Sequence, residues 1–128
     1  MGKIQNEKLI ECILGYLKDC IDANRFQIFQ LEKNLNFIAE YNLTKARIIE
    51  ILQNIKVKDF FESAPSKRIP DSYVYKFSPQ VLLCNAFGEE EQVDMYVKFE
   101  IQTLESGENA AIISFHNLEY PVTYFPFR

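Results

Sequence analysis

The stretch VDMYVKFEIQ, residues 93–102, decides the fold of this chain, because apolar and polar residues alternate along its whole length. Such alternation is typical of a β-strand with one buried face and one exposed face. The apolar face would hold Val93, Met95, Val97, Phe99 and Ile101. The polar face would hold Asp94, Tyr96, Lys98, Glu100 and Gln102.

The strand at 93–102 has several expected neighbours in the second half of the chain. A second apolar run, AIISFH at residues 111–116, follows the turn-forming residues 106–109, and this order predicts an antiparallel hairpin. Two further strands are expected at 73–77 and 81–87, before an acidic turn at 88–91. The second half therefore predicts an antiparallel sheet.

The only histidine of the chain, His116, ends the second run of the hairpin. We expect Ile113 and Phe115 to face the core. His116 then lies on the same exposed sheet face as Tyr96 and Lys98. The register decides this arrangement, since a slip of one residue would turn His116 inward.

The first half of the chain has apolar residues at helical spacing. Thr44 is expected to cap one of the helices at its N-terminus. In the helix before it, Leu35, Ile38 and Ala39 are expected to face inward. The expected elements are helices at 8–21, 31–41 and 44–54, a short strand or extended linker at 25–31, and one further helical turn at 58–63.

These elements predict an α+β fold, in which N-terminal helices pack on a C-terminal antiparallel β-sheet. One domain over residues 1–128 is expected, mainly helical at 1–63 and forming a sheet at 73–128. Residues 64–72 contain two prolines and no periodicity, which predicts a loop. The tail at 120–128 also has two prolines, so we expect an extended edge segment there.

Charge is distributed unevenly along the chain. Residues 1–76 carry 12 Lys/Arg and 10 Asp/Glu, a balance of +2, whereas residues 77–128 carry 2 and 8, a balance of −6. The sheet half is therefore acidic. Because a protein that grips phosphates usually shows a basic patch, this balance argues against nucleic acid as a partner of the sheet half.

Composition excludes several other classes of protein. No run approaches 18 consecutive apolar residues, and the first eight residues lack the apolar stretch of a secretion signal, so we expect a cytoplasmic protein without a membrane partner. Cys12, Cys20 and Cys84 have no metal-ligand spacing and are expected to be reduced thiols. With a single histidine, no metal site or cofactor is expected.

Several short motifs resemble, in order and spacing, the motility quorum-sensing regulator (MqsR) type of toxin from type II toxin-antitoxin systems. The resemblance covers most of the chain. Its motifs are QLEKN at 30–34, EYNLT at 40–44, ILQNIKVKDFF at 51–61, MYVK at 95–98, and ISFH at 113–116 with EYP at 119–121.

The resemblance implies a small toxin of the RelE-like fold that cleaves messenger RNA without a metal and is silenced by an antitoxin protein. Tyr96 matches a functional tyrosine in the family's Tyr-x-Lys strand, and Lys98 would hold the phosphate. His116 stands where some members have a functional lysine, and an imidazole would serve there as acid or base near neutral pH. The chain departs from the family at Glu62, where some members have lysine. Another polar position of the family falls near Tyr75 or Lys76.

Each candidate residue also has a structural interpretation. His116 would then cap its strand or bond a backbone group beside Asn117. Tyr96 and Lys98 would be an ordinary pair on a sheet face. The loop pair Lys67 and Arg68 is either solvated or, with Lys76, a weak contact for RNA.

The acidic sheet half supports a rival hypothesis. Glu89, Glu90 and Glu91 form either a solvated turn or part of a face that binds a basic surface on another protein. The chain would then be a non-enzymatic inhibitor or adaptor from a phage or other mobile element. An enzyme requires His116 and Tyr96 to converge in a concave site, whereas an inhibitor requires a flat acidic face.

Overall fold

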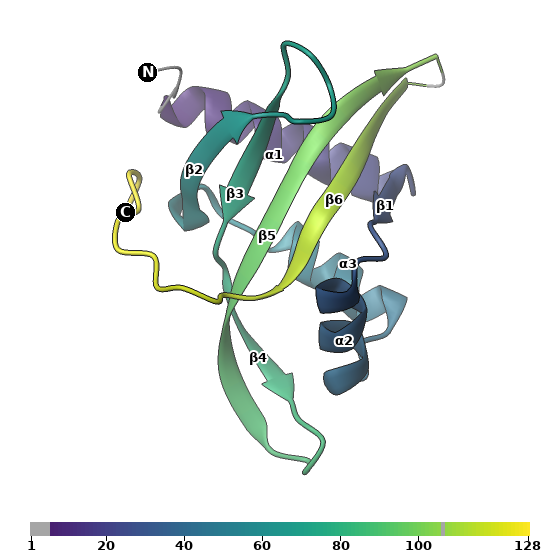
Figure 1. The fold of residues 1–128 in the computed structure, drawn as a ribbon, viewed down its shortest axis with the longest axis vertical. Coiled ribbons are helices and arrows are strands. Elements are labelled where there is room, and N and C mark those ends of the chain that lie inside the picture. The colour runs from purple at the N-terminus through teal and green to yellow at the C-terminus, as the bar shows by residue number, and fades with distance from the viewer. Residues whose placement is uncertain (1–5, 106) are drawn as a thin grey trace.

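The computed structural model describes residues 6–105 and 107–128. Within them, three α-helices and a short 3-10 turn accompany a six-stranded, mostly antiparallel sheet, which confirms the predicted α+β fold (Figure 1). The helical elements are α1 (Glu7–Asp22), α2 (Glu32–Glu40), α3 (Lys45–Gln53) and the turn η1 (Val57–Asp59). The strands are β1 (Phe26–Ile28), β2 (Phe60–Pro65), β3 (Tyr73–Phe77), β4 (Gln80–Cys84), β5 (Glu90–Leu104) and β6 (Gly107–Asn117).

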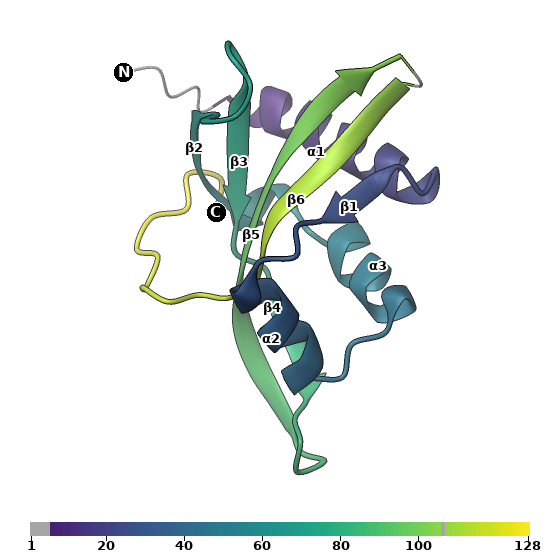
Figure 2. The same cartoon turned by 45° about the vertical axis from the view of Figure 1, so that its right-hand side comes forward.

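The sheet is built around the long strand β5. Its order is β1-β6-β5-β3-β2, and β4 pairs with the first residues of β5. This β4–β5 pair projects beyond the rest of the molecule as a two-stranded ribbon (Figures 1 and 2). The short segment at 25–31, predicted as strand or linker, contributes β1, which runs parallel to β6 and makes the sheet mixed.

Helices α1 and α3 lie behind the sheet in Figure 1 and bury one of its faces. The N-terminus of α1 is capped by Asn6, whose side chain accepts hydrogen bonds from two backbone N–H groups. Thr44 caps α3 in the same manner, as predicted. Stacked rings of Phe77 and Phe99, with centroids 5.6 Å apart, fill the centre of the core. The opposite sheet face has no helix across it (Figure 1). The alternating burial of β5 places Tyr96 and Lys98 on that face.

Two predicted boundaries in the middle of the chain are wrong. The helical turn predicted at 58–63 is present only as the 3-10 turn η1, which ends at Asp59, and residues 60–63 belong instead to β2, which pairs with β3. The loop predicted at 64–72 therefore begins only after Pro65. Pro65 ends β2, which has only one neighbouring strand, and proline is tolerated at such an edge position.

The prediction that Ile113 joins the core is also wrong. Lys98 lies opposite Ser114 but Phe99 lies opposite Ile112, so Ile113 is the extra residue of a β-bulge. Ile112 is fully buried in its place. The alternation that predicts which side chains face inward fails at a bulge, because one residue is added to one strand only.

Asn34 of α2 holds the bulge in place. Its amide group donates to the backbone oxygens of Ile113, at 3.0 Å, and Phe29, at 2.9 Å. Its oxygen accepts a 2.8 Å bond from the backbone N–H of Phe115. The inward face of α2 therefore holds this asparagine and Phe37, whereas Leu35, predicted to face inward, is half exposed.

The C-terminal tail forms no strand, in agreement with its prolines. It turns back along β2, where Phe127 stacks on Phe60 with a centroid distance of 5.7 Å. Residues 118–128 therefore lie outside the sheet predicted at 73–128. The turn predicted at 106–109 is also wrong at its end, since β6 starts at Gly107. Ser106 lies outside the described residues. Residues 1–5, part of the N-terminus in which no secretion signal is expected, lie outside them too. None of the described helices is long and apolar enough to span a membrane.

Candidate RNA-binding face

A row of polar residues crosses the open face of the sheet. Lys76 on β3 pairs with Glu62 on β2 and with Lys98 on β5, and Lys98 pairs in turn with Ser114 on β6. In this row Lys76 and Lys98 lie directly opposite each other, although their strands are distant in sequence. Lys76 Nζ forms a 3.1 Å ion pair with Glu62 Oε1, whereas no such bond is present at Lys98 Nζ within the described residues.

Tyr96 and His116 form a second row beside the first. The two residues lie directly opposite each other on β5 and β6, and their ring centroids are 5.5 Å apart. This is the face that the alternation predicts for both. His116 is only 6% exposed, however, so this part of the face is covered rather than open.

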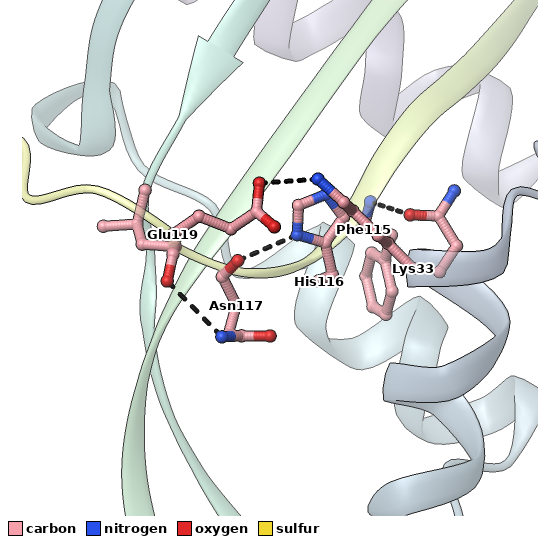
Figure 3. Close-up of polar contacts among 7 residues, drawn as sticks. Lys33, Phe115, His116, Asn117 and Glu119 are labelled. Atoms are coloured by element: carbon pink, nitrogen blue, oxygen red, sulfur yellow. Dashed lines mark hydrogen bonds and ion pairs between the residues drawn. The ribbon is translucent and has the colours of Figure 1, made fainter.

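The hydrogen bond of His116 defines the state of its ring. Nδ1 lies 2.8 Å from the backbone oxygen of Asn117 (Figure 3). A carbonyl oxygen only accepts, so Nδ1 carries a proton. The structural role expected for His116, a bond to a backbone group beside Asn117, is therefore present.

Glu119 lies next to His116 and links the tail to α2. Its Oε1 accepts a 2.7 Å bond from Lys33 Nζ (Figure 3). That hydrogen bond is the main reason why the pKa of Glu119 is lowered, and the charges of Lys33 and His116 add to the effect. The carboxylate is therefore ionised at neutral pH.

Tyr96 faces a cavity of about 340 Å³, here called the Tyr96 cavity. Phe61, Glu62 and Lys76 line it together with residues 118–122 of the tail. Burial raises the pKa of Tyr96, and the charges of Glu62 and Glu119 raise it further. The hydroxyl therefore stays protonated at neutral pH and is able to donate a hydrogen bond.

A second cavity, of about 300 Å³, adjoins the first at Lys76, and we call it the Glu100 cavity. Burial lowers the pKa of Lys98 at its edge, and the positive charges of Lys76 and Lys67 contribute. Its charged lining consists of Lys67, Arg68, Lys76, Lys98 and Glu100. Its remaining walls are Ala64, Pro65, Ser66, Val74 and Ile113.

The Glu100 cavity corrects the argument from charge along the chain. The sheet half is acidic in sequence, but Lys67 and Arg68 of the loop and Lys76 of β3 gather around Lys98. Four cations and one carboxylate therefore line a single cavity. Splitting the sequence at residue 76 separated charges that the fold brings together.

The structure thus brings five of the six predicted site residues to the walls of two adjoining cavities. These are Tyr96, Lys98, Lys76, Lys67 and Arg68. His116 is the exception, because it packs behind the Tyr96 ring and lines neither cavity. Sequence reasoning missed Glu100, although its place on the polar face of the 93–102 strand was a signal for it.

A third concavity, of about 480 Å³, lies on the acidic side of the molecule. Four carboxylates and two tyrosines stand on its walls, and neither lysine nor arginine does: the residues are Glu40, Glu91, Asp94, Glu119, Tyr41 and Tyr120. Tyr41 donates a 3.2 Å hydrogen bond to Glu91. This acidic groove adjoins the Tyr96 cavity along residues 118–121 of the tail and shares no lining residue with the Glu100 cavity.

No protein-family model matches this sequence, and no curated protein matches it either. Residues 6–105 and 107–128 contain no group of three His, Cys, Asp or Glu side chains placed to hold a metal ion.

Proposed function

We propose that this protein is an endoribonuclease that binds single-stranded RNA on the open sheet face and cleaves it without a metal ion or cofactor. One observation carries the proposal: a protonated tyrosine and four cations surround two adjoining cavities on one face. Side chains of this kind bind the phosphates of RNA and stabilise negative charge that develops during cleavage.

The phosphate would sit between Lys76 and Lys98, which lie directly opposite each other on neighbouring strands. Their positive charges would stabilise the extra negative charge on phosphorus during attack. Lys98, whose pKa is lowered, releases a proton more easily than an ordinary lysine and is suited to protonate the leaving 5′-oxygen.

Cleavage also needs a base for the attacking 2′-hydroxyl. Tyr96 does not suit this role, because its raised pKa keeps the hydroxyl protonated. Glu62 does suit it, since its carboxylate lines the Tyr96 cavity. The 2′-oxygen would attack phosphorus while Glu62 takes its proton, and breaking the P–O5′ bond would leave a 2′,3′-cyclic phosphate and a 5′-hydroxyl.

In this proposal His116 positions Tyr96 rather than touching RNA. The imidazole packs against the Tyr96 ring and is held by its bond to the Asn117 carbonyl. A tyrosine fixed from behind presents its hydroxyl to the phosphate with little freedom to move, and such preorganisation increases the rate of reaction.

The MqsR-like interpretation of the chain extends this proposal to a toxin of the RelE-like fold, acting on messenger RNA in the cytoplasm. It also implies a protein partner, an antitoxin that covers the site. The sheet face and helices are compatible with that architecture. The interpretation rests on the sequence motifs, with the site geometry as additional support.

Product analysis with the variant Tyr96→Phe tests the proposal. Wild type, in excess chelator, should cut single-stranded RNA to products with cyclic phosphate and 5′-hydroxyl ends. Tyr96→Phe should cut about 10²-fold more slowly or worse, because one donor to the transition state is lost. Tyr16→Phe, on the exposed side of α1, is the matched control and should cut like wild type. Intact RNA with wild type would overturn the proposal.

The acidic groove favours the alternative function, a non-enzymatic inhibitor or adaptor that binds a basic protein surface. No arginine or lysine stands on the groove wall, and Lys33 offsets only Glu119 among its four carboxylates. If this is the function, Glu91→Gln should weaken binding of a lysine-rich or arginine-rich partner, and the RNA assay should show no cleavage. Tyr96→Phe would leave that binding unchanged.

A further inference from the structure

The ribbon formed by β4 and the first residues of β5 ends in an exposed aromatic ring. Phe87, in the turn between the two strands, is 87% exposed, and Leu82 on β4 is 57% exposed. Glu89 and Glu90 follow the ring and are also exposed. Because the ribbon projects beyond the rest of the molecule (Figures 1 and 2), its tip presents apolar surface and two carboxylates to solvent.

The pairing of β4 with β5 shows which side of the ribbon continues the open sheet face. Tyr96 lies on the open face, and burial alternates along β5 between Glu90 and Tyr96, so Glu90 points to the same side. Cys84 lies directly opposite Glu90, and Leu82 shares the side of Cys84 because it is two residues away on the same strand. The open face therefore extends onto the ribbon as an apolar and acidic surface.

The Glu100 cavity, at the other end of the open face, has the complementary character. Four cations line it, and Pro65 and Ile113 contribute apolar wall. Lys67 is exposed and the Arg68 side chain is 42% exposed, so these cations are accessible without any movement of the loop. A ring flanked by carboxylates matches a cavity of this kind in both polarity and charge.

The ribbon is unable to reach the cavity of its own chain. Glu90 and Lys98 are eight residues apart on the single strand β5. At about 3.3 Å per residue, that strand holds them roughly 26 Å from each other. A ribbon that fills the cavity must therefore come from a second copy. Two copies related by a two-fold axis would form both contacts at once, because the spacing between ribbon and cavity is the same in each.

We infer that a second copy of this chain docks its ribbon on the open sheet face, with Phe87 against the apolar wall of the Glu100 cavity and Glu89 and Glu90 against its cations. The result is a symmetric dimer. The inference rests on the proposed function in one respect, because a dimer of this kind covers the RNA-binding face. RNA and the second copy then compete, and the dimer is inactive.

Sedimentation equilibrium over a series of protein concentrations tests whether the dimer forms. Wild type should dimerise reversibly, and added salt should weaken the dimer because it screens the charges. Phe87→Ser and Glu90→Lys should each weaken dimerisation at least about tenfold. Glu11→Lys is the matched control, since it makes the same charge change at an exposed position of α1 and should dimerise like wild type. A wild type that stays monomeric, or ribbon variants that dimerise normally, would overturn the inference.

A spin label on the ribbon tests where the two copies touch. Cys12 and Cys84 are exposed whereas Cys20 is buried, so Cys12→Ser directs the label to Cys84. The labelled chain is mixed with an isotope-labelled chain in which both exposed thiols are replaced by serine. Amide signals of the loop at 66–72 and of Lys98 in the isotope-labelled chain should broaden. Broadening confined to β4, as in edge-to-edge pairing of ribbons, or to α1 would overturn the inference.

Competition connects the dimer to the proposed function. Single-stranded DNA, which lacks the attacking 2′-hydroxyl, should separate the wild-type dimer, and a dimer that persists in excess DNA would contradict the competition. Cleavage per molecule should fall as wild type is concentrated but not as Phe87→Ser is. If the dimer forms and RNA stays intact, the nuclease is wrong and the dimer stands. If monomeric wild type cuts RNA, the dimer is wrong and the nuclease stands.

Discussion

Lys76 and Lys98 lie directly opposite each other on β3 and β5, so two positive side chains occupy one cross-strand pair. Like charges in this position destabilise a sheet. The Lys76–Glu62 ion pair offsets part of the repulsion, and burial lowers the pKa of Lys98, with the charge of Lys76 as the second cause. An anion between the two lysines would relieve the rest, which is why we regard this pair as the centre of the RNA-binding face.

Replacing Lys98 by methionine should stabilise the protein and remove its activity. The repulsion from Lys76 disappears and the alkyl chain is kept, so the free energy of unfolding should rise by roughly 0.2 to 1 kcal/mol. Urea denaturation at neutral pH measures this change. The same substitution at exposed Lys8 on α1 is the control and should leave stability unchanged. A clear loss of stability in Lys98→Met would contradict the account of the pair.

The lowered pKa of Lys98 also predicts a pH dependence. Between its pKa in the folded protein and the ordinary lysine value, the unfolded chain holds the proton more tightly, so stability rises with pH in that window. The raised pKa values of Tyr75 and Tyr96 act oppositely at higher pH. The free energy of unfolding is measured against pH for wild type and Lys98→Met. Subtracting the second curve from the first cancels the contribution of the tyrosines. The difference should rise with pH just below the ordinary pKa of lysine, and a flat or falling difference would refute the assignment.

Asn34 should be among the residues whose loss costs most stability. Asn34→Ala removes three hydrogen bonds next to the bulge, those to the backbone oxygens of Phe29 and Ile113 and to the N–H of Phe115. We expect a loss of about 3 kcal/mol in the free energy of unfolding. Asn36→Ala, at an exposed position of the same helix, should lose little. Equal effects of the two substitutions would show that Asn34 does not hold the bulge.

Two substitutions distinguish a positioning role of His116 from a catalytic role. Asn at position 116 keeps an N–H near the place of Nδ1 and its bond to the Asn117 carbonyl, whereas Ala removes it. If His116 positions Tyr96, His116→Asn should cleave RNA faster than His116→Ala. The pH profile of RNA cleavage by His116→Asn should also match that of wild type. Activity in His116→Asn as low as in His116→Ala, with both variants folded, would instead make His116 the acid or base.

The sequence predicts the fold well where its period is regular. Alternation in residues 93–102 predicts β5 and the shared face of Tyr96 and Lys98, because β5 keeps a period of two through these residues. The bulge at Ile113 depends on Asn34, which is 79 residues away, so no local pattern contains it. Contacts between distant segments are decided by tertiary packing.

The same limit applies to the site. Tyr96 and Lys98 are predicted from their shared face, whereas Lys67, Arg68 and Lys76 are predicted only as weak contacts for RNA. The pairing of Arg68 with buried Glu100 is not visible in sequence, since a glutamate on a polar face normally faces solvent. His116 was expected at the surface of the site, and only the packed structure shows that the Tyr96 ring stands in front of it.

The measurement that tests the central claim most directly is cleavage of a long single-stranded RNA in excess chelator by wild type, Lys98→Met and Lys8→Met. We predict cutting by wild type and Lys8→Met, with little or none by Lys98→Met, although that variant should be at least as stable. Intact RNA with all three proteins would contradict the nuclease. Equal cutting by all three would show that the chemistry lies away from the open sheet face.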